Sequence, residues 1–283
     1  MTYNVIYIGS SGRGCDYINC HSEYNVVGVI CQRSMIDEEL LTCCYLRDVP
    51  IFEINNYSGL KQALEQNRNK FDFAIMFIFG MILKEDILDN FNVYNIHLGF
   101  LPGYKGRNST FHATMRGEKR VGISLHKAVL KIDEGEIISR KSVPYYFWMG
   151  EMALRQSAAE QIPNLLTDLA RYMEDPDYQT IANNSESYYP PITASMLEIN
   201  EYTPVKDVMN IIRSQDFYHG GRFIYGGATY LIKEAKVSLF NTADPDLVET
   251  SDRIILKNGR PFGIRINDSH YLQFKIDRIA NFI

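Results

Sequence analysis

The sequence predicts an α/β fold, in which a Rossmann-like, doubly wound and mostly parallel sheet is followed by a small β-rich C-terminal domain. In the first half, short apolar runs alternate with amphipathic stretches, which is typical of parallel strands covered by helices on both faces. Right-handed crossovers place those helices on the two faces in turn. In the last third, Gly and Asn separate short apolar runs, as in strands joined by tight turns. The chain has 283 residues, which is enough for a sizeable core.

Strands and helices alternate in the first 98 residues. The run FDFAIMFIF (71–79) is almost continuously apolar, as expected of a strand that is buried on both faces. The predicted strands span 4–9, 25–31, 49–54, 71–79 and 92–98, and the predicted helices span 10–20 (after a turn), 36–46, 57–67 and 84–91.

Beyond residue 98 the predicted elements change in order. A helix over 109–118 is followed by two antiparallel strands, 121–129 and 135–145. A long helix then runs from about 151 to 174 and bends at Pro163, because proline removes a helical hydrogen bond.

A linker is predicted over 174–191, because EDPDYQTIANNSESYYPP is polar and contains three prolines. We therefore expect one domain over 1–189 and a small β-rich domain over 190–283. The second domain begins with a helix that has Thr203 as its N-cap and Pro204 in its first turn, and that runs to about Gln215.

Composition argues against nucleic-acid and membrane partners. The net charge is −5, which gives no broad attraction for nucleic acid or anionic lipid. No apolar run reaches the roughly 18 residues needed to cross a bilayer. The first residues, MTYNVIYIG, have no basic leader before an apolar core, so we expect no signal peptide and a cytoplasmic protein.

Cysteine spacing argues against a metal site. No CxxC pair occurs, and His21 directly follows Cys20, which is not a usual spacing for zinc ligands. We expect reduced thiols packed as small hydrophobes. The cysteines are Cys15, Cys20, Cys31, Cys43 and Cys44.

The stretch SSGRG (10–14) follows a strand and opens a helix, where a phosphate could bind. Glycines at 9, 12 and 14 do not match G-x-G-x-x-G, and no acidic residue ends the second strand at Cys31 to hold a ribose. A tight strand-to-helix turn is the favoured interpretation, and a dinucleotide-binding oxidoreductase is the weaker alternative.

The strand over 92–98 ends in two polar residues, Asn95 and His97, which point to one face because they are two apart. Ligands of open α/β sheets bind at such carboxyl ends. An Asn amide can donate to a developing oxyanion, and a His can accept a proton near neutral pH. Asp133, before Gly135 in a tight loop, could orient the His. Periodicity alone favours an ordinary structural role for Asn95 and His97. Their catalytic roles therefore depend on the longer stretch of sequence around them.

The block NIHLGFLPGYKGRNSTFHATMRGEKRVGISLHKAVLKIDEGEI resembles the 10-formyltetrahydrofolate-dependent formyltransferases, and most closely the sugar N-formyltransferases. It holds Asn95-Ile96-His97, the loop Leu101–Gly106, Gly122-x-Ser124-x-His126 and Asp133-Glu134-Gly135 in the family's order. Leu98-Gly99-Phe100 replaces the usual Pro-Ser-Leu, Lys105 replaces Arg and Ser124 replaces Thr. These departures affect acceptor-side contacts and leave the Asn, His and Asp in place.

The resemblance implies that an amine attacks the formyl group of 10-formyltetrahydrofolate without a metal. Asn95 would donate to the oxyanion, and His97 would stabilise the intermediate or remove the proton of the amine. Asp133 would orient His97 and help move protons, its pKa raised if folate covers it. Backbone groups of Phe79, Gly80, Met81 and Ile82, together with Asp133, would bind the folate; without the resemblance, residues 79–82 read as core strand. We expect His126 to support the Asp133 loop and His112 to be structural or solvated.

Three kinds of amine acceptor are compatible with this resemblance. Residues 191–283 carry 11 Lys plus Arg and 11 Asp plus Glu, so this region lacks the basic stripe that tRNA binding needs. A methionyl-tRNA formyltransferase is therefore kept only as the alternative to an enzyme that acts on a sugar. Glycinamide ribonucleotide formyltransferases lack the C-terminal domain. The resemblance therefore favours a nucleotide-linked dideoxy amino sugar of surface polysaccharide, such as O-antigen. A module that hydrolyses or senses 10-formyltetrahydrofolate is a further alternative.

Substrate contacts are predicted at six positions. Arginine suits diphosphate, and aromatic rings can stack on a base. The alternatives are a solvated basic loop at 104–107 and aromatic residues that close the domain junction. Exposed strands in the C-terminal domain also predict a homodimer. The six positions are Tyr104, Lys105, Arg107, Arg213, Phe217 and Tyr218.

Overall fold

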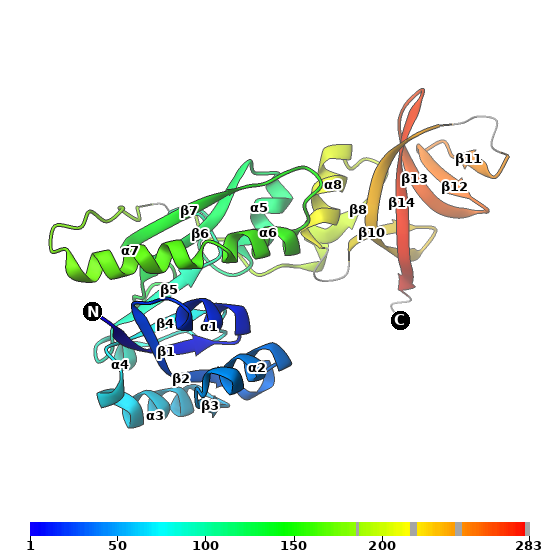
Figure 1. Ribbon diagram of the computed structural model, residues 1–283. Helices are drawn as coiled ribbons and strands as arrows, with labels where there is room; N and C mark the ends of the chain where they lie inside the picture. Colours follow the sequence, from blue (N-terminus) through cyan, green and yellow to red (C-terminus); the bar gives the residue numbers. More distant parts are fainter. Residues whose placement is uncertain (185–186, 216–219, 241–244, 281–283) are drawn as a thin grey trace. The chain divides into compact units, whose positions relative to one another are not determined.

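The computed structural model describes residues 1–184, 187–215, 220–240 and 245–280 (Figure 1). It divides into two compact units, each with its own sheet. The first comprises Met1–Gly106, Arg120–Pro144 and Gln156–Tyr189, and the second comprises Arg107–Lys119, Tyr145–Arg155 and Pro190–Ile283. The parallel-rich first sheet and the β-rich second sheet confirm the predicted fold class. The linear boundary at 189/190 stays a prediction, since the second unit also takes two earlier segments.

The first unit contains a sheet of strand order β3-β2-β1-β4-β5-β6-β7. Neighbours from β3 to β5 pair in parallel, while β5–β6 and β6–β7 are antiparallel, as predicted. The strands are β1 (Tyr3–Gly9), β2 (Tyr24–Gln32), β3 (Ile51–Ile54), β4 (Phe73–Phe77), β5 (Val93–His97), β6 (Arg120–Lys127) and β7 (Ile137–Pro144).

Helices cover both faces of this sheet. Leu60 and Leu64 of α3 pack in one core with Ile6 and Ile8 of the first strand, whereas Tyr24 at the start of β2 donates to the carbonyl of Leu166 on the other face. Side chains of Ser11, Asp37 and Asn56 cap the first three helices by accepting backbone N–H groups. The elements are α1 (Gly12–Asn19), η1 (Arg33–Met35), α2 (Glu38–Arg47), α3 (Tyr57–Asn67), η2 (Arg68–Lys70), α4 (Glu85–Leu88) and α7 (Ile162–Glu174).

Several predicted elements are shorter than expected. The helix predicted over 84–91, for example, is α4 (Glu85–Leu88). The strand over 71–79 ends at Phe77, because Ile78 adopts a left-handed backbone with φ of 53°. The long helix over 151–174 is two helices, α6 (Glu151–Ala159) and α7, and Pro163 lies in the first turn of the second. Proline is tolerated there because the first helical N–H groups need no partner within the helix.

The second unit is built on a sheet of order β11-β12-β13-β14-β10-β9-β8, in which only β8–β9 is parallel among the described pairs. Val208 and Ile212 pack with Phe223, Ile232 and Leu272 in its core. The elements are α5 (Ser109–Arg116), η3 (Ala194–Leu197), β8 (Glu198–Ile199), α8 (Val205–Ser214), β9 (Gly221–Tyr225), β10 (Ala228–Leu239), β11 (Leu247–Glu249), β12 (Ile254–Lys257), β13 (Arg260–Asn267) and β14 (His270–Ala280).

The predicted N-cap of α8 is wrong by one residue. Pro204 is the N-cap, and no side chain makes a capping hydrogen bond there. The hydroxyl of Thr203 instead accepts from the backbone N–H of Asn200, so it closes the preceding turn.

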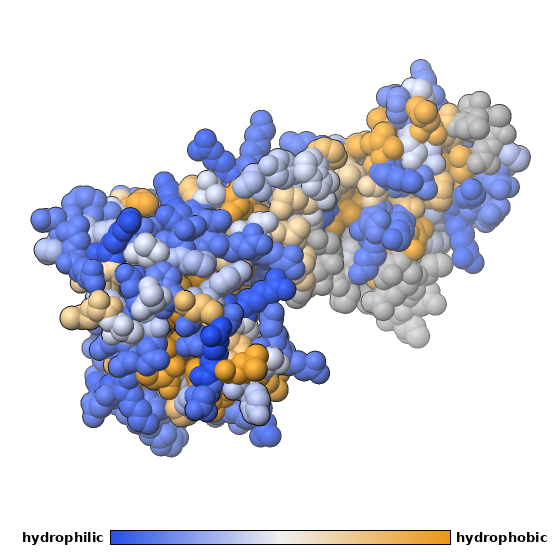
Figure 2. Space-filling model, viewed as in Figure 1, coloured by the Kyte–Doolittle hydropathy of each residue, from blue (hydrophilic) through white to orange (hydrophobic). Residues whose placement is uncertain are grey.

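Four cysteines are buried, and Cys20 is exposed beside Arg47, whose Nη2 lies 2.9 Å from its Sγ. Among the described residues, no group of three or more His, Cys, Asp and Glu side chains could hold a metal ion. In the same part of the chain, every helix is too short or too polar to cross a membrane. Hydrophilic residues cover much of the face seen in Figure 2, with smaller hydrophobic patches between them.

Candidate active site

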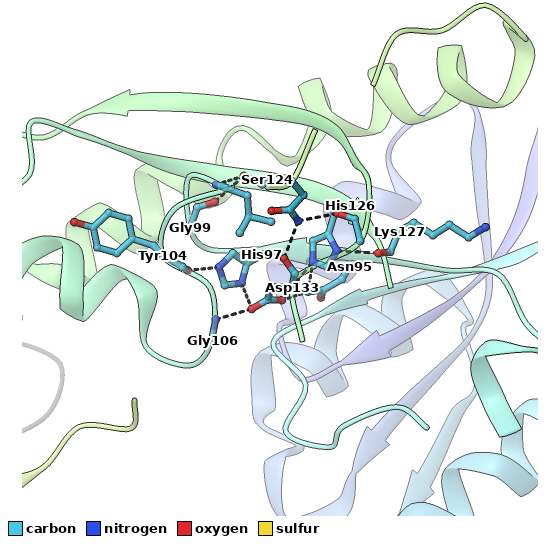
Figure 3. Close-up of polar contacts among 12 residues, drawn as sticks. Asn95, His97, Gly99, Tyr104, Gly106, Ser124, His126, Lys127 and Asp133 are labelled. Atoms are coloured by element: carbon cyan, nitrogen blue, oxygen red, sulfur yellow. Dashed lines mark hydrogen bonds and ion pairs between the residues drawn. The ribbon is translucent and has the colours of Figure 1, made fainter. Parts of the chain in front are cut away.

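The strand β5 carries Asn95 and His97, and its pairing with β6 determines what lies next to them. The antiparallel register sets Asn95 opposite His126 and His97 opposite Ser124. The turn that follows β6 returns Asp133 to the same place (Figure 3). Residues 38 positions apart are thus joined, since Asn95 Nδ2 lies 3.4 Å from Asp133 Oδ1.

The polar contacts of these residues form one network. Asn95 Nδ2 lies 3.0 Å from His126 Nε2, and His97 Nδ1 lies 3.5 Å from Asp133 Oδ2. The backbone N–H of Gly106 donates to Asp133 Oδ2 at 2.8 Å. Asp133 is only 8% exposed and His97 only 9%, so these charges interact with little screening by water. The structure therefore brings together the three residues predicted to be catalytic in one cluster, in which His97 and Asp133 are buried and Asn95 is half-buried.

The partners of each imidazole fix its tautomer. His97 Nε2 lies 2.8 Å from the Tyr104 carbonyl, which can only accept, so this nitrogen carries a proton and Nδ1 faces Asp133. His126 Nδ1 lies 2.9 Å from the Lys127 carbonyl and is protonated by the same argument. Its Nε2 therefore accepts from the amide of Asn95, which orients that amide.

The pKa values of His97 and Asp133 are both lowered, for different physical reasons. Burial lowers the pKa of His97, although the Asp133 carboxylate and the Tyr104 carbonyl raise it in part. Burial raises the pKa of Asp133, but His97, His126 and the Gly106 N–H together outweigh burial and lower it to about 2. Asp133 is therefore ionised at neutral pH. The raised pKa expected for Asp133 under a bound folate is not found in the protein alone, where the shift is downward.

The loop that contains Asp133 is tight, as predicted from Gly135. Asp133 has a left-handed backbone, with φ of 54°. A Cβ at Gly135 would lie 1.7 Å from the carbonyl oxygen of Lys127, so only glycine fits there. The close approach aims the Asp133 carboxylate back toward β5.

Ser124 holds the loop that follows β5. Its Oγ accepts from the Leu101 N–H at 3.0 Å and donates to the Gly99 carbonyl at 2.7 Å. The sequence showed Ser124 only as a replacement for Thr, and its hydroxyl is the part that both residues share. This role was missed, because it depends on contacts across the sheet.

The predicted folate contacts lie directly after β4. Phe79 and Met81 pack against the core of the first unit, and Ile82 is 58% exposed. A Cβ at Gly80 would lie 2.8 Å from the Gln32 side-chain oxygen. The carbonyl of Ile78 accepts from both the N–H and the hydroxyl of Ser10, which fixes this turn. Backbone binding of folate by residues 79–82 stays a prediction.

The predicted substrate residues fall in different places. Lys105 is 2% exposed, with Nζ 3.9 Å from Glu134 Oε1, so the alternative of a solvated loop is wrong for this residue. Tyr104 stacks on Tyr189, with ring centroids 4.9 Å apart. Arg107 is exposed and belongs to the second unit.

Arg213 also belongs to the second unit, where it donates to the Phe147 carbonyl at 2.7 Å and to the side chain of Asn210. Phe217 and Tyr218 lie outside the described residues. His112 is buried and bonds the Pro190 carbonyl at 2.8 Å, which is a structural contact as expected. None of these observations brings Arg213 to the polar cluster, and its contact with a nucleotide stays a prediction.

The glycines near residue 10 serve packing. A Cβ at Gly12 would lie 2.6 Å from the backbone of Glu39, and one at Gly14 would lie 2.6 Å from the ring of Phe77. Ser11 caps α1. These contacts favour the tight strand-to-helix turn over a phosphate site.

Comparisons with known proteins agree with this geometry. The family model described as formyl transferase matches residues 22–168, more than half of the chain. A methionyl-tRNA formyltransferase of Pseudothermotoga lettingae is 27% identical over 252 residues, which cover 82% of each chain.

Two solved structures share the fold over nearly the whole chain. An N-formyltransferase from Helicobacter canadensis, in complex with folinic acid and dTDP-3-aminofucose, is 18% identical with a TM-score of 0.68, and the match covers 98% of this chain and 100% of that one. HypX from Aquifex aeolicus is 15% identical with a TM-score of 0.68, and the match covers 99% of this chain and 46% of that one. The family model extends from before β2 into α7, so its match includes Asn95, His97 and Asp133. The chain therefore belongs to the formyl transferase family.

Proposed function

We propose that this chain is an N-formyltransferase that transfers the formyl group of 10-formyltetrahydrofolate to the amine of a nucleotide-linked amino sugar. The observation that carries the proposal is the cluster of half-buried Asn95 with buried His97 and Asp133 at the carboxyl end of β5. The sugar would be a dideoxy amino sugar used in surface polysaccharide such as O-antigen.

In this reaction the amine nitrogen bonds to the formyl carbon, and the carbonyl π electrons move onto oxygen. The resulting tetrahedral oxyanion collapses with cleavage of the bond to folate N10, which leaves a formamide and tetrahydrofolate. The proton lost by the amine passes to the His97–Asp133 pair, and N10 takes up a proton as it leaves. Asn95 Nδ2 stabilises the oxyanion as a hydrogen-bond donor.

The contacts of Asn95 suit this role. One amide hydrogen is directed to His126 at 3.0 Å, whereas the contact to Asp133 is longer, at 3.4 Å. The longer contact is the weaker one, so it is the hydrogen that a developing oxyanion can take over. His126 keeps the amide oriented during this exchange.

The charge of the C-terminal region favours a small acceptor. Residues 191–283 carry 11 Lys plus Arg and 11 Asp plus Glu, so this region offers no excess of cations for a phosphate backbone. A structural neighbour that matches nearly the full length was solved with dTDP-3-aminofucose. A nucleotide sugar is therefore the better-supported acceptor.

Methionyl-tRNA is the second candidate, favoured by the 27% identity to the Pseudothermotoga lettingae formyltransferase. One assay separates the two. The protein is mixed with 10-formyltetrahydrofolate and either dTDP-, UDP- and GDP-linked amino sugars or methionyl-tRNA, and products are analysed by mass spectrometry.

We expect one amino sugar to gain a single formyl group. A formylated methionyl-tRNA with no formylated sugar would contradict the proposal. Release of formate without any acceptor would indicate a hydrolase. His97→Ala and Asp133→Ala variants serve as controls that abolish the transfer.

A further inference from the structure

The segment after α7, predicted as a linker, lies along the first unit as part of its packed structure. The N–H of Ile181 donates to the carbonyl of Ile137 at 2.8 Å, and the reverse bond is 3.3 Å long. These bonds attach the segment to β7. We call residues 181–183 and 187–189 the clamp segment.

At its first end, the clamp segment holds the loop of Asp133. Asn183 Nδ2 donates to the backbone carbonyls of Asp133 and Gly135, at 2.8 Å each. Both hydrogens of this amide are therefore used on one turn. Its Oδ1 is buried and makes no hydrogen bond within the described part of the chain, so the side chain is held by its donors alone.

At its other end, the clamp segment holds the loop of Tyr104. Lys105 N–H donates to the Ser187 carbonyl at 3.2 Å, and Tyr189 N–H donates to the Lys105 carbonyl at 3.0 Å. The Ser187 hydroxyl donates to the Pro102 carbonyl at 3.2 Å. Tyr104 and Tyr189 stack with their ring planes 8° apart.

These two loops supply the two partners of His97. The Tyr104 carbonyl accepts from Nε2, and the Asp133 carboxylate faces Nδ1. One short segment thus holds both groups that orient the imidazole. The contact to Asp133 is the longer of the two, at 3.5 Å, so it depends more on the placement of its loop.

We infer that Asn183 is a positioning residue, which sets the Asp133 carboxylate against His97 through the backbone of the Asp133 loop. The clamp segment then supports the catalytic centre through these two loops. This inference rests on the proposed function for its kinetic readout but has a second readout that needs no acceptor.

The kinetic test compares Asn183→Ala with Asn184→Ala, a matched control at the next position, where the same residue type is exposed. We expect N183A to lower kcat about 10- to 100-fold with KM nearly unchanged, as when a supporting group is lost and the reacting groups shift. N184A should keep the wild-type kcat. Asn183→Gln retains the donors on a longer arm and should restore part of the activity.

The second test measures the titration of His97 by NMR on protein with 15N-labelled histidine, assigned with a His97→Gln variant. The titratable groups that face His97 are Asp133 and His126. Because the Asp133 carboxylate raises the His97 pKa, N183A should lower that pKa, and N184A should leave it unchanged.

The two readouts separate the inference from the proposed function. If no amino sugar is formylated but N183A moves the His97 titration, the inference stands and the acceptor is wrong. If N183A matches N184A in both the His97 titration and kcat, the inference is overturned. Should N183A fail to fold, Asn183→Leu, which has nearly the same shape but lacks the two donors, is measured in the same way, and a wild-type titration and a wild-type kcat together would overturn the inference.

Discussion

Asp133 combines three properties in one residue: a left-handed backbone, a buried carboxylate and contacts to two histidines. Aspartate and asparagine both tolerate the left-handed region better than other residues with a Cβ. Asp133→Asn therefore removes the charge and leaves the loop intact, which makes it a cleaner probe than alanine.

We expect Asp133→Asn to lower kcat about 100- to 10,000-fold, the range found for general acid–base groups. The reason is that a neutral amide neither stabilises an imidazolium at His97 nor helps to accept the proton that the amine releases. Steady-state rates and a thermal melt measure activity and folding separately. Asp89→Asn, an exposed carboxyl of the same unit, is the control. Near-wild-type turnover in D133N would show that Asp133 is structural.

His97 makes folding stability depend on pH. Its pKa is lowered by burial in the folded protein, below the ordinary value of about 6.5 for the unfolded chain. The unfolded chain therefore binds more protons just below pH 6.5, so the free energy of unfolding falls as the pH drops through that region.

Urea titrations between pH 7 and 5 test this dependence. The wild type should lose stability toward pH 5, and His97→Gln should lose less. Burial also lowers the pKa of His112, so H97Q should still lose some stability toward pH 5. Equal slopes for wild type and H97Q would contradict the expected protonation difference.

At the scale of elements, the turn between β6 and β7 depends on one glycine. Gly135→Ala places a methyl group against the Lys127 carbonyl, 1.7 Å from the ideal Cβ position, and a backbone atom cannot give way easily. We expect the free energy of unfolding to fall by more than about 2 kcal/mol. Gly59→Ala within α3 is the matched control.

At Gly59 the nearest atom to an ideal Cβ is 3.4 Å away, an ordinary contact. Alanine favours helix over glycine by about 1 kcal/mol, so G59A should be neutral or stabilising. Chemical denaturation of both variants decides the point. A G135A protein as stable as G59A would mean that the turn relaxes freely.

Local patterns were enough to predict most elements of the first unit. The helix over 57–67 has the predicted bounds, and the strand over 25–31 is one residue longer at each end. The strand over 71–79 was predicted too long, because apolar residues continue beyond the point where Ile78 turns the chain. The apolar pattern of a sequence indicates which side chains are buried, but it does not indicate where the backbone angles change.

The site could be predicted where spacing or motif order carried it. Asn95 and His97 share a face of one strand, and Asp133 came from the ordered block. Asn183 could not be found this way, because its bonds go to backbone carbonyls 48 and 50 residues earlier. The composition of 174–191 suggested a linker, since polar residues and prolines mark loops whether or not they are packed.

At the scale of the whole molecule, balanced charge predicts weak salt dependence. A nucleotide sugar carries few phosphates, so kcat/KM should change less than about threefold between 50 and 200 mM salt. A tRNA acceptor bound through several phosphates would lose about 1,000-fold or more. Initial rates with each acceptor across this range give the answer, and a steep decline for the sugar would contradict the charge argument.

The distribution of thiols has a practical consequence. Four of the five cysteines are buried, and Cys20 alone is exposed in the described structure, at the end of α1. A maleimide dye should therefore attach at one position without any engineered substitution. Such a single-site label gives the wild-type chain a fluorescent reporter for following ligand binding and unfolding.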